Sequence, residues 1–206
     1  MGFRLSPKDL SLINILKYTF NPISIFGTKK KLYVSALGIT SCGKTTLQNY
    51  LRHENYMDAT IGSNDIRDIV LRHGFDIIAL TKGKDVSGST QATKSYNEDE
   101  FYKSDICYYI FNSKNLLENA DYCDEVVGRL NFLNKLNVKQ KPKEKTKIIL
   151  LASHFDTLKG TNQEKMIIWN KIENIANEGH LTQPMYVNLK NKEDLKKIKT
   201  ALFNGI

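Results

Sequence analysis

The chain has 206 residues, 41% of them hydrophobic, which is enough for one globular domain with a substantial core. Its net charge of +8 comes from short lysine patches without interleaved aromatic residues or an RNA-binding motif, so we expect no nucleic-acid partner. Three cysteines without regular spacing favour a cytoplasmic protein, and no apolar run is long enough to span a bilayer. We interpret the lysine patches as solvated surface, with contact to an anionic membrane as the second interpretation.

Apolar runs of strand length alternate with segments of helical periodicity along the chain. A strand is expected over 30–38, followed by a glycine-containing loop and a helix that begins at Lys44. Two apolar runs, 66–74 and 75–83, then predict a hairpin. The remaining expected strands are 106–112, 148–156 and 184–190, and the remaining expected helices are 116–138, 164–179 and 192–203. This order predicts an α/β fold with a mostly parallel mixed sheet and helices on both faces, and a ligand at the carboxyl ends of the strands.

The loop after the first strand, GITSCGKTT at 38–46, matches the pattern G-x-x-x-x-G-K-[ST] of phosphate-binding loops. Glycines let the backbone wrap closely, so that its amides and the following helix N-terminus can cradle phosphates. Lys44 would reach the outer phosphates, and Thr45 would place a hydroxyl on Mg²⁺. Cys42 is interpreted as a spacer rather than as a thiol with a lowered pKa. The candidate phosphate-binding residues of this phosphate loop are Gly38, Ser41, Cys42, Gly43, Lys44, Thr45 and Thr46.

Four further motifs follow the phosphate loop: TIGSN at 60–64, DVSG at 85–88, SHFD at 153–156 and NLK at 188–190. Together with the loop they resemble the motifs of small GTPases of the Ras superfamily, most closely the Arf-like branch, from residue 29 to the C-terminus. The resemblance implies a P-loop NTPase fold and a molecular switch that binds GTP or GDP with Mg²⁺. It also implies an effector or regulatory protein as partner, whose identity the sequence does not indicate.

For the switch segments, the resemblance implies that Thr60 binds Mg²⁺ and the γ-phosphate in the triphosphate state. Asp85 would hold Mg²⁺ through water, so that the metal set is Thr45, Thr60 and Asp85, and the Gly88 amide would sense the γ-phosphate. A second register stays open, in which Thr81 or Lys82 ends the strand and no carboxylate serves the metal. The spacing forward to the strand at 106–112 favours Asp85.

For the base, the resemblance implies that Asp156 accepts two hydrogen bonds from guanine and that His154 lies over the ring. Ser153 and His154 replace the asparagine and lysine of the usual N-K-x-D, and the result resembles the T-H-x-D variant of Roco-type GTPase domains. The backbone N–H of Leu189, followed by Lys190, would meet the guanine carbonyl. An alternative interpretation treats SHFD as a simple turn after a strand.

Catalysis would fall to Lys44, Thr60, Gly88 and Ser89 in this scheme. Ser89 occupies the place of the family's water-orienting glutamine and its hydroxyl is too short for that task, so we expect slow GTP hydrolysis. Gln91 could substitute only in a remodelled loop. Two alternatives stay open: a pseudo-GTPase that binds nucleotide without cleaving it, and a P-loop protein that uses ATP.

Residues 1–28 precede the GTPase-like domain, which we place at 29–206. Ser6 and Pro7 are typical of a helix start, and the apolar residues that follow recur at helical spacing, which predicts an amphipathic helix. Such a helix could lie in a membrane interface, which would make the protein peripheral to a membrane, or it could pack on its own domain or on a partner. The first six residues also fit the pattern for N-myristoylation at Gly2.

Overall fold

The computed structural model describes residues 30–52, 63–66, 69–73, 76–80, 83–86, 93–141, 145–178 and 181–204. The predicted N-terminal helix lies outside this part of the chain. No helix among the described residues is both long and apolar enough to cross a membrane.

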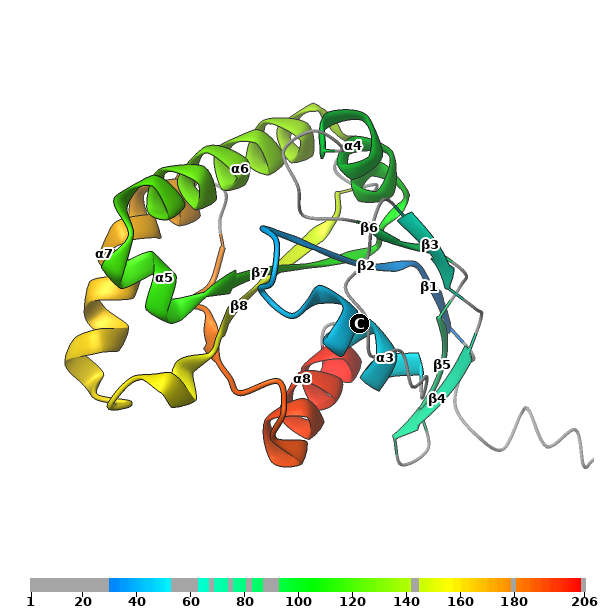
Figure 1. Cartoon of the computed structure of the whole chain (residues 1–206). Coiled ribbons are helices and arrows are strands. Elements are labelled where there is room, and N and C mark those ends of the chain that lie inside the picture. Colours follow the sequence, from blue (N-terminus) through cyan, green and yellow to red (C-terminus); the bar gives the residue numbers. More distant parts are fainter. Residues whose placement is uncertain are drawn as a thin grey trace, which may run out of the picture.

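Parallel strands form the centre of the molecule, as the sequence predicts (Figure 1). Strand β2 (Val34–Gly38) pairs with β7 (Ile106–Asn112), β7 pairs with β8 (Lys147–Ser153), and β8 pairs with the short β9 (Met185–Tyr186). All of these pairs are parallel, so the carboxyl ends of the four strands meet at one edge of the sheet. The phosphate loop follows β2 at this edge.

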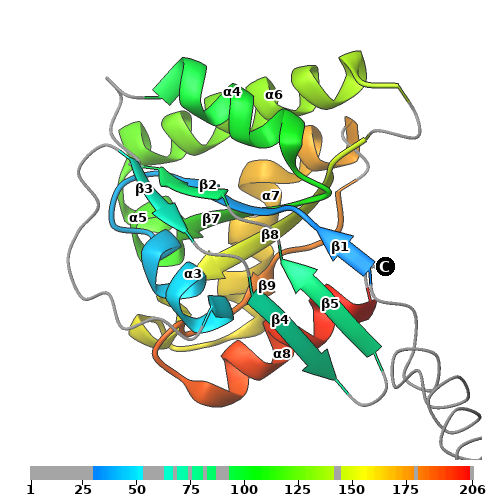
Figure 2. The same ribbon diagram turned by 90° about the vertical axis from the view of Figure 1, so that its right-hand side faces the viewer.

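The predicted hairpin is confirmed, and it is longer than the apolar runs indicate (Figure 2). Strand β4 (Ile69–His73) is antiparallel to β5 (Asp76–Leu80), and β3 (Ser63–Ile66) is antiparallel to β6 (Gly83–Val86). Both strand pairs follow the same antiparallel register: each step forward along the first strand is a step back along the second, with no shift between the two pairs. The four strands are therefore segments of one hairpin. The hairpin joins the centre through β1 (Lys30–Leu32), which is parallel to β5 and leads into β2.

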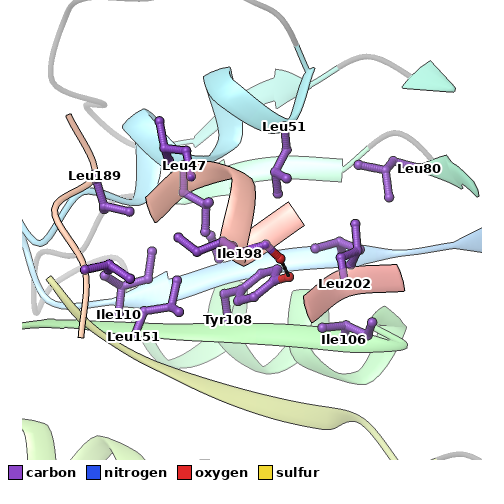
Figure 3. Packing of buried hydrophobic residues seen from close by; sticks show 14 of the residues in the cluster. Leu47, Leu51, Leu80, Ile106, Tyr108, Ile110, Leu151, Leu189, Ile198 and Leu202 are labelled. Atoms are coloured by element: carbon purple, nitrogen blue, oxygen red, sulfur yellow. Dashed lines mark hydrogen bonds between the residues drawn. The ribbon is translucent and has the colours of Figure 1, made fainter. Parts of the chain in front are cut away.

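Helices cover both faces of the parallel strands (Figures 1 and 2). Successive residues of a strand point to opposite faces, and in β7 Tyr108 and Ile110 belong to one buried cluster while Tyr109 and Phe111 belong to the other. The first cluster lies under α3 and α8, where the Tyr108 hydroxyl donates to the backbone oxygen of Ile198 at 3.2 Å (Figure 3). The second lies under the other four helices. The helices are α3 (Lys44–Arg52), α4 (Thr93–Lys103), α5 (Ser113–Glu118), α6 (Ala120–Lys139), α7 (Asn162–Glu178) and α8 (Lys192–Asn204).

Two helices differ from the sequence prediction. The polar stretch TKSYNEDEFYK forms α4, whose sequence shows little periodicity, although its Phe101 is completely buried. The single helix expected over 116–138 is two helices, because Asn119 has extended backbone angles. Its side-chain oxygen accepts from the Tyr122 amide at 3.0 Å and so caps the start of α6.

Candidate functional site

The phosphate loop has the backbone shape that only its glycines permit. Gly38 has φ +150° and Gly43 has φ +105°. A Cβ atom on Gly38 would lie 2.1 Å from the backbone oxygen of Ile110, and one on Gly43 would lie 2.4 Å from Cδ1 of Leu189. The loop is therefore pressed against the β7 backbone at Gly38 and against the Leu189 side chain at Gly43, and the positive φ angles disfavour larger residues at both positions.

Lys44 lies at the start of α3 with its side chain turned back over the phosphate loop. Its Nζ donates to the backbone oxygen of Ile39 at 2.9 Å, and the residue is buried. The first turn of the helix begins where the Leu47 amide donates to the Gly43 oxygen at 3.0 Å. The N-terminus of a helix carries partial positive charge, so Lys44 and α3 together make this loop suited to anions. The tight backbone, the lysine and the helix end fit the phosphates of a nucleotide.

Ser153 connects the phosphate loop to the SHFD motif. Its completely buried hydroxyl lies 2.7 Å from the backbone oxygen of Cys42 and 3.0 Å from that of Phe111. The same oxygen is 2.9 Å from Nδ1 of His154. One hydroxyl hydrogen serves one carbonyl at a time, so the contact with His154 is best made by an Nδ1–H that donates to Ser153. The two motifs, far apart in sequence, are thus in direct contact.

The rest of the SHFD motif turns sharply outward after β8. His154 has a left-handed backbone with φ 56° and ψ 26° and is half-buried. Asp156 follows in a short 3₁₀ helix and is exposed, and its carboxylate has no hydrogen bond or ion pair with any described residue. The two carboxylate oxygens of Asp156 are therefore available as hydrogen-bond acceptors at the edge of the site. The role of Asp156 in binding a base stays a prediction.

The NLK segment packs beside both motifs. The Val187 amide donates to the backbone oxygen of Ala152 at 3.0 Å. The Asn188 amide donates to the Asp194 carboxylate at 2.9 Å, which ties the segment to the first turn of α8. Leu189 is buried over Gly43, and its amide has no hydrogen-bond partner within the described ranges. Lys190 is exposed.

Burial and hydrogen bonds together shift the pKa values of Cys42 and Asp194. Burial raises the pKa of the Cys42 thiol, and the positive charge of Lys44 offsets only part of this effect. The thiol is therefore protonated at neutral pH, which speaks against a lowered thiol pKa, and the role of Cys42 as a spacer stays a prediction. Burial opposes ionisation of Asp194 as well, but the Asn188 amide and Lys197 outweigh it and lower the pKa of this carboxyl.

The backbone of Asp85 lies in β6, and its side chain is outside the description. Strand β6 contacts β2 and α3, and it ends at Val86, one residue beyond Asp85. If the β1–β5 register is continued along β2 and β6, Asp85 comes opposite Leu37, directly before the phosphate loop. This position agrees better with the register that uses Asp85 than with a strand that ends at Thr81, although its role in binding metal stays a prediction.

Three predicted residues, Thr60, Gly88 and Ser89, lie outside the described residues. The structure adds a residue that the motifs did not indicate. Arg129 of α6 donates from Nη1 to the Gly38 oxygen at 3.4 Å. No sequence signal marks this arginine, because its contact depends on how α6 packs over the end of β2.

Comparisons with known proteins support the fold. No protein-family model and no curated protein matches the sequence. Among solved structures, the chain is similar to the Arl6 (BBS3) small GTPase from Trypanosoma brucei with a bound nucleotide analogue, GppNp. The TM-score is 0.59 at 17% identity, and the match covers 84% of this chain and 97% of the other. The chain therefore has the α/β P-loop fold of a small GTPase.

Proposed function

We propose that this protein is a guanine-nucleotide-binding molecular switch of the Arf-like kind that hydrolyses GTP slowly. The observation that carries the proposal is the direct contact of Ser153 with Cys42, which brings a loop suited to phosphates and a loop with an exposed carboxylate to one edge of the sheet. A guanine nucleotide needs both loops, because backbone amides bind its phosphates and a carboxylate accepts two hydrogen bonds from the edge of the guanine base. The structural likeness to a small GTPase supports the same conclusion at the level of the fold.

In this proposal each group of the site has a separate task. Lys44 and the amides at the start of α3 stabilise the negative charge of the phosphates. Asp156 accepts from the two donors of the guanine edge, and His154 lies over the ring. Thr45, Thr60 and Asp85 would hold Mg²⁺, which neutralises phosphate charge when bound.

Hydrolysis requires a water oriented for in-line attack on the γ-phosphate. Ser89 stands where the resemblance places a glutamine, which favours slow turnover and gives weight to a second function, a binding module that does not cleave GTP. Phosphate release from purified protein with GTP separates the two. Sustained release that is lost in Lys44→Ala supports the enzyme, and tight binding without release supports the module.

Substitution of Asp156, the proposed base-binding residue, tests which nucleotide the protein binds. We expect guanine nucleotide to be released from the purified, denatured protein, and we expect GDP to raise the melting temperature more than ADP does. Asp156→Asn replaces an acceptor oxygen with a donor amide, and xanthine has a carbonyl where guanine has an amino group. The variant should therefore prefer XDP to GDP. Equal protection by ADP and GDP, unchanged in Asp156→Asn, would favour the ATP-using alternative.

The N-terminal segment completes the proposal. We propose that its amphipathic helix brings the protein to membranes in the cytoplasm, where the switch acts on a regulatory partner. Full-length protein and a variant lacking residues 1–26 should differ in sedimentation with anionic vesicles. Identical sedimentation would remove the membrane part of the proposal and leave nucleotide binding untouched.

A further inference from the structure

Arg129 lies in the middle of α6 and reaches the first residue of the phosphate loop. Its Nη1 donates to the Gly38 oxygen at 3.4 Å, and its Nη2 lies 2.5 Å from Oε1 of Glu125, one helical turn earlier. The side chains are 17% and 33% exposed, so the pair is largely shielded from water. Glu125 therefore holds the guanidinium in one orientation, with an N–H directed at the loop.

Two cations fix two successive peptide groups at the start of the phosphate loop. Arg129 binds the oxygen of Gly38, and Lys44 binds the oxygen of Ile39 at 2.9 Å. In a trans peptide the carbonyl and the next N–H point in opposite directions, so the contact with Arg129 turns the Ile39 amide away from α6. Because glycine has more backbone freedom than other residues, the peptide between Gly38 and Ile39 is held in one orientation only by contacts such as this hydrogen bond.

The charge of Arg129 also reaches the interior of the loop. Burial, the largest influence, raises the pKa of the Cys42 thiol, and the positive charges of Lys44 and, to a smaller extent, Arg129 offset part of this rise. Lys44 differs from Arg129, since the Ile39 oxygen is the only hydrogen-bond partner of its Nζ among the described residues, and its other N–H donors can turn toward phosphates when they bind.

We propose that Arg129 is a positioning residue of the phosphate loop, which orients the peptide between Gly38 and Ile39 before a nucleotide binds. This inference rests on the proposed function, because it supposes that the loop holds nucleotide phosphates. A preorganised loop loses less conformational freedom on binding, so Arg129 contributes to affinity without contacting the ligand. Guanine recognition, which depends on the SHFD motif, is not affected by Arg129.

The test compares GDP binding by calorimetry in full-length variants. Arg129→Gln removes both the positive charge and the guanidinium group with its several N–H donors, whereas Arg129→Lys keeps only the charge. Lys135→Gln removes an exposed charge from the same helix and serves as the control. We expect Arg129→Gln to weaken GDP binding about tenfold, the low end for a charge-assisted hydrogen bond. Arg129→Lys should recover part of the loss, and Lys135→Gln should bind as the wild type does.

A spectroscopic measurement separates positioning from simple stabilisation. In Arg129→Gln the ³¹P resonance of the β-phosphate of bound GDP should shift, and the preference for GDP over ADP should stay unchanged. A lowered melting temperature with GDP affinity within about twofold of wild type, or an unmoved resonance, would overturn the assignment. If Arg129→Gln does not fold, full wild-type affinity in Arg129→Lys has the same meaning. A wild-type protein that binds no GDP would overturn the proposed function and this inference together.

Discussion

Ser153→Ala tests the connection between the two halves of the site. The hydroxyl is completely buried and lies within 3.0 Å of two backbone oxygens and of Nδ1 of His154. Loss of a buried hydrogen bond that leaves its partners without a substitute costs about 1–3 kcal/mol. For a chain of this length a loss of about 2 kcal/mol lowers the melting temperature by roughly 4–8 °C. The Cys42 end of the phosphate loop also loses its attachment to the SHFD motif, so affinity for GDP should fall as well.

The assay is thermal unfolding by circular dichroism, with and without GDP, and its control is Ser104→Ala. The Ser104 hydroxyl is buried at the opposite end of the strands, with the Ser35 hydroxyl at 2.7 Å and the Glu100 backbone oxygen at 2.5 Å. Both variants should lose similar stability, but Ser153→Ala alone should lose part of the stabilisation by GDP. Equal stabilisation of the two variants by GDP would refute the reasoning that Ser153 couples the loops.

Three further predictions concern single residues around the site. Gly43→Ala would place a Cβ 2.4 Å from Cδ1 of Leu189 at a backbone angle that alanine rarely adopts, so we expect a lower melting temperature and much weaker GDP binding, measured together. Burial raises the pKa of the Cys42 thiol, so alkylation of native protein at pH 7.5 should label the half-buried Cys123 first; mass spectrometry that finds Cys42 equally labelled would contradict this. The lowered pKa of Asp194 means that its ionised form stabilises the fold at pH values above its unfolded pKa of about 3.9, and that this stabilisation is lost as the pH falls through the folded pKa. Asp194→Asn should thus be less stable than wild type at pH 7 in urea unfolding, with the difference shrinking below about pH 4, and a difference independent of pH would count against the assigned cause.

Much of the fold follows from local sequence. The continuous apolar run ICYYIFN predicts a strand buried on both sides, and the structure places Tyr108 and Tyr109 in opposite clusters. The phosphate loop is recognisable from the sequence because Gly38 and Gly43 occupy positions where the backbone has a positive φ angle, which glycine adopts readily. Helix α4 was not predicted, because Phe101 gives too weak a signal within a polar stretch.

Tertiary structure alone decided how the site is assembled. The hydrogen bond from Ser153 to Cys42 joins residues 111 positions apart, and no local pattern encodes such a contact. The contact of Leu189 with Gly43 and the hydrogen bond from Arg129 to Gly38 are likewise not encoded locally, since each depends on how helices and strands pack against one another. Sequence determined which groups are present at the strand ends, because side-chain chemistry and periodicity are local. Packing determined which of those groups touch, because parallel strands bring distant segments to a common edge.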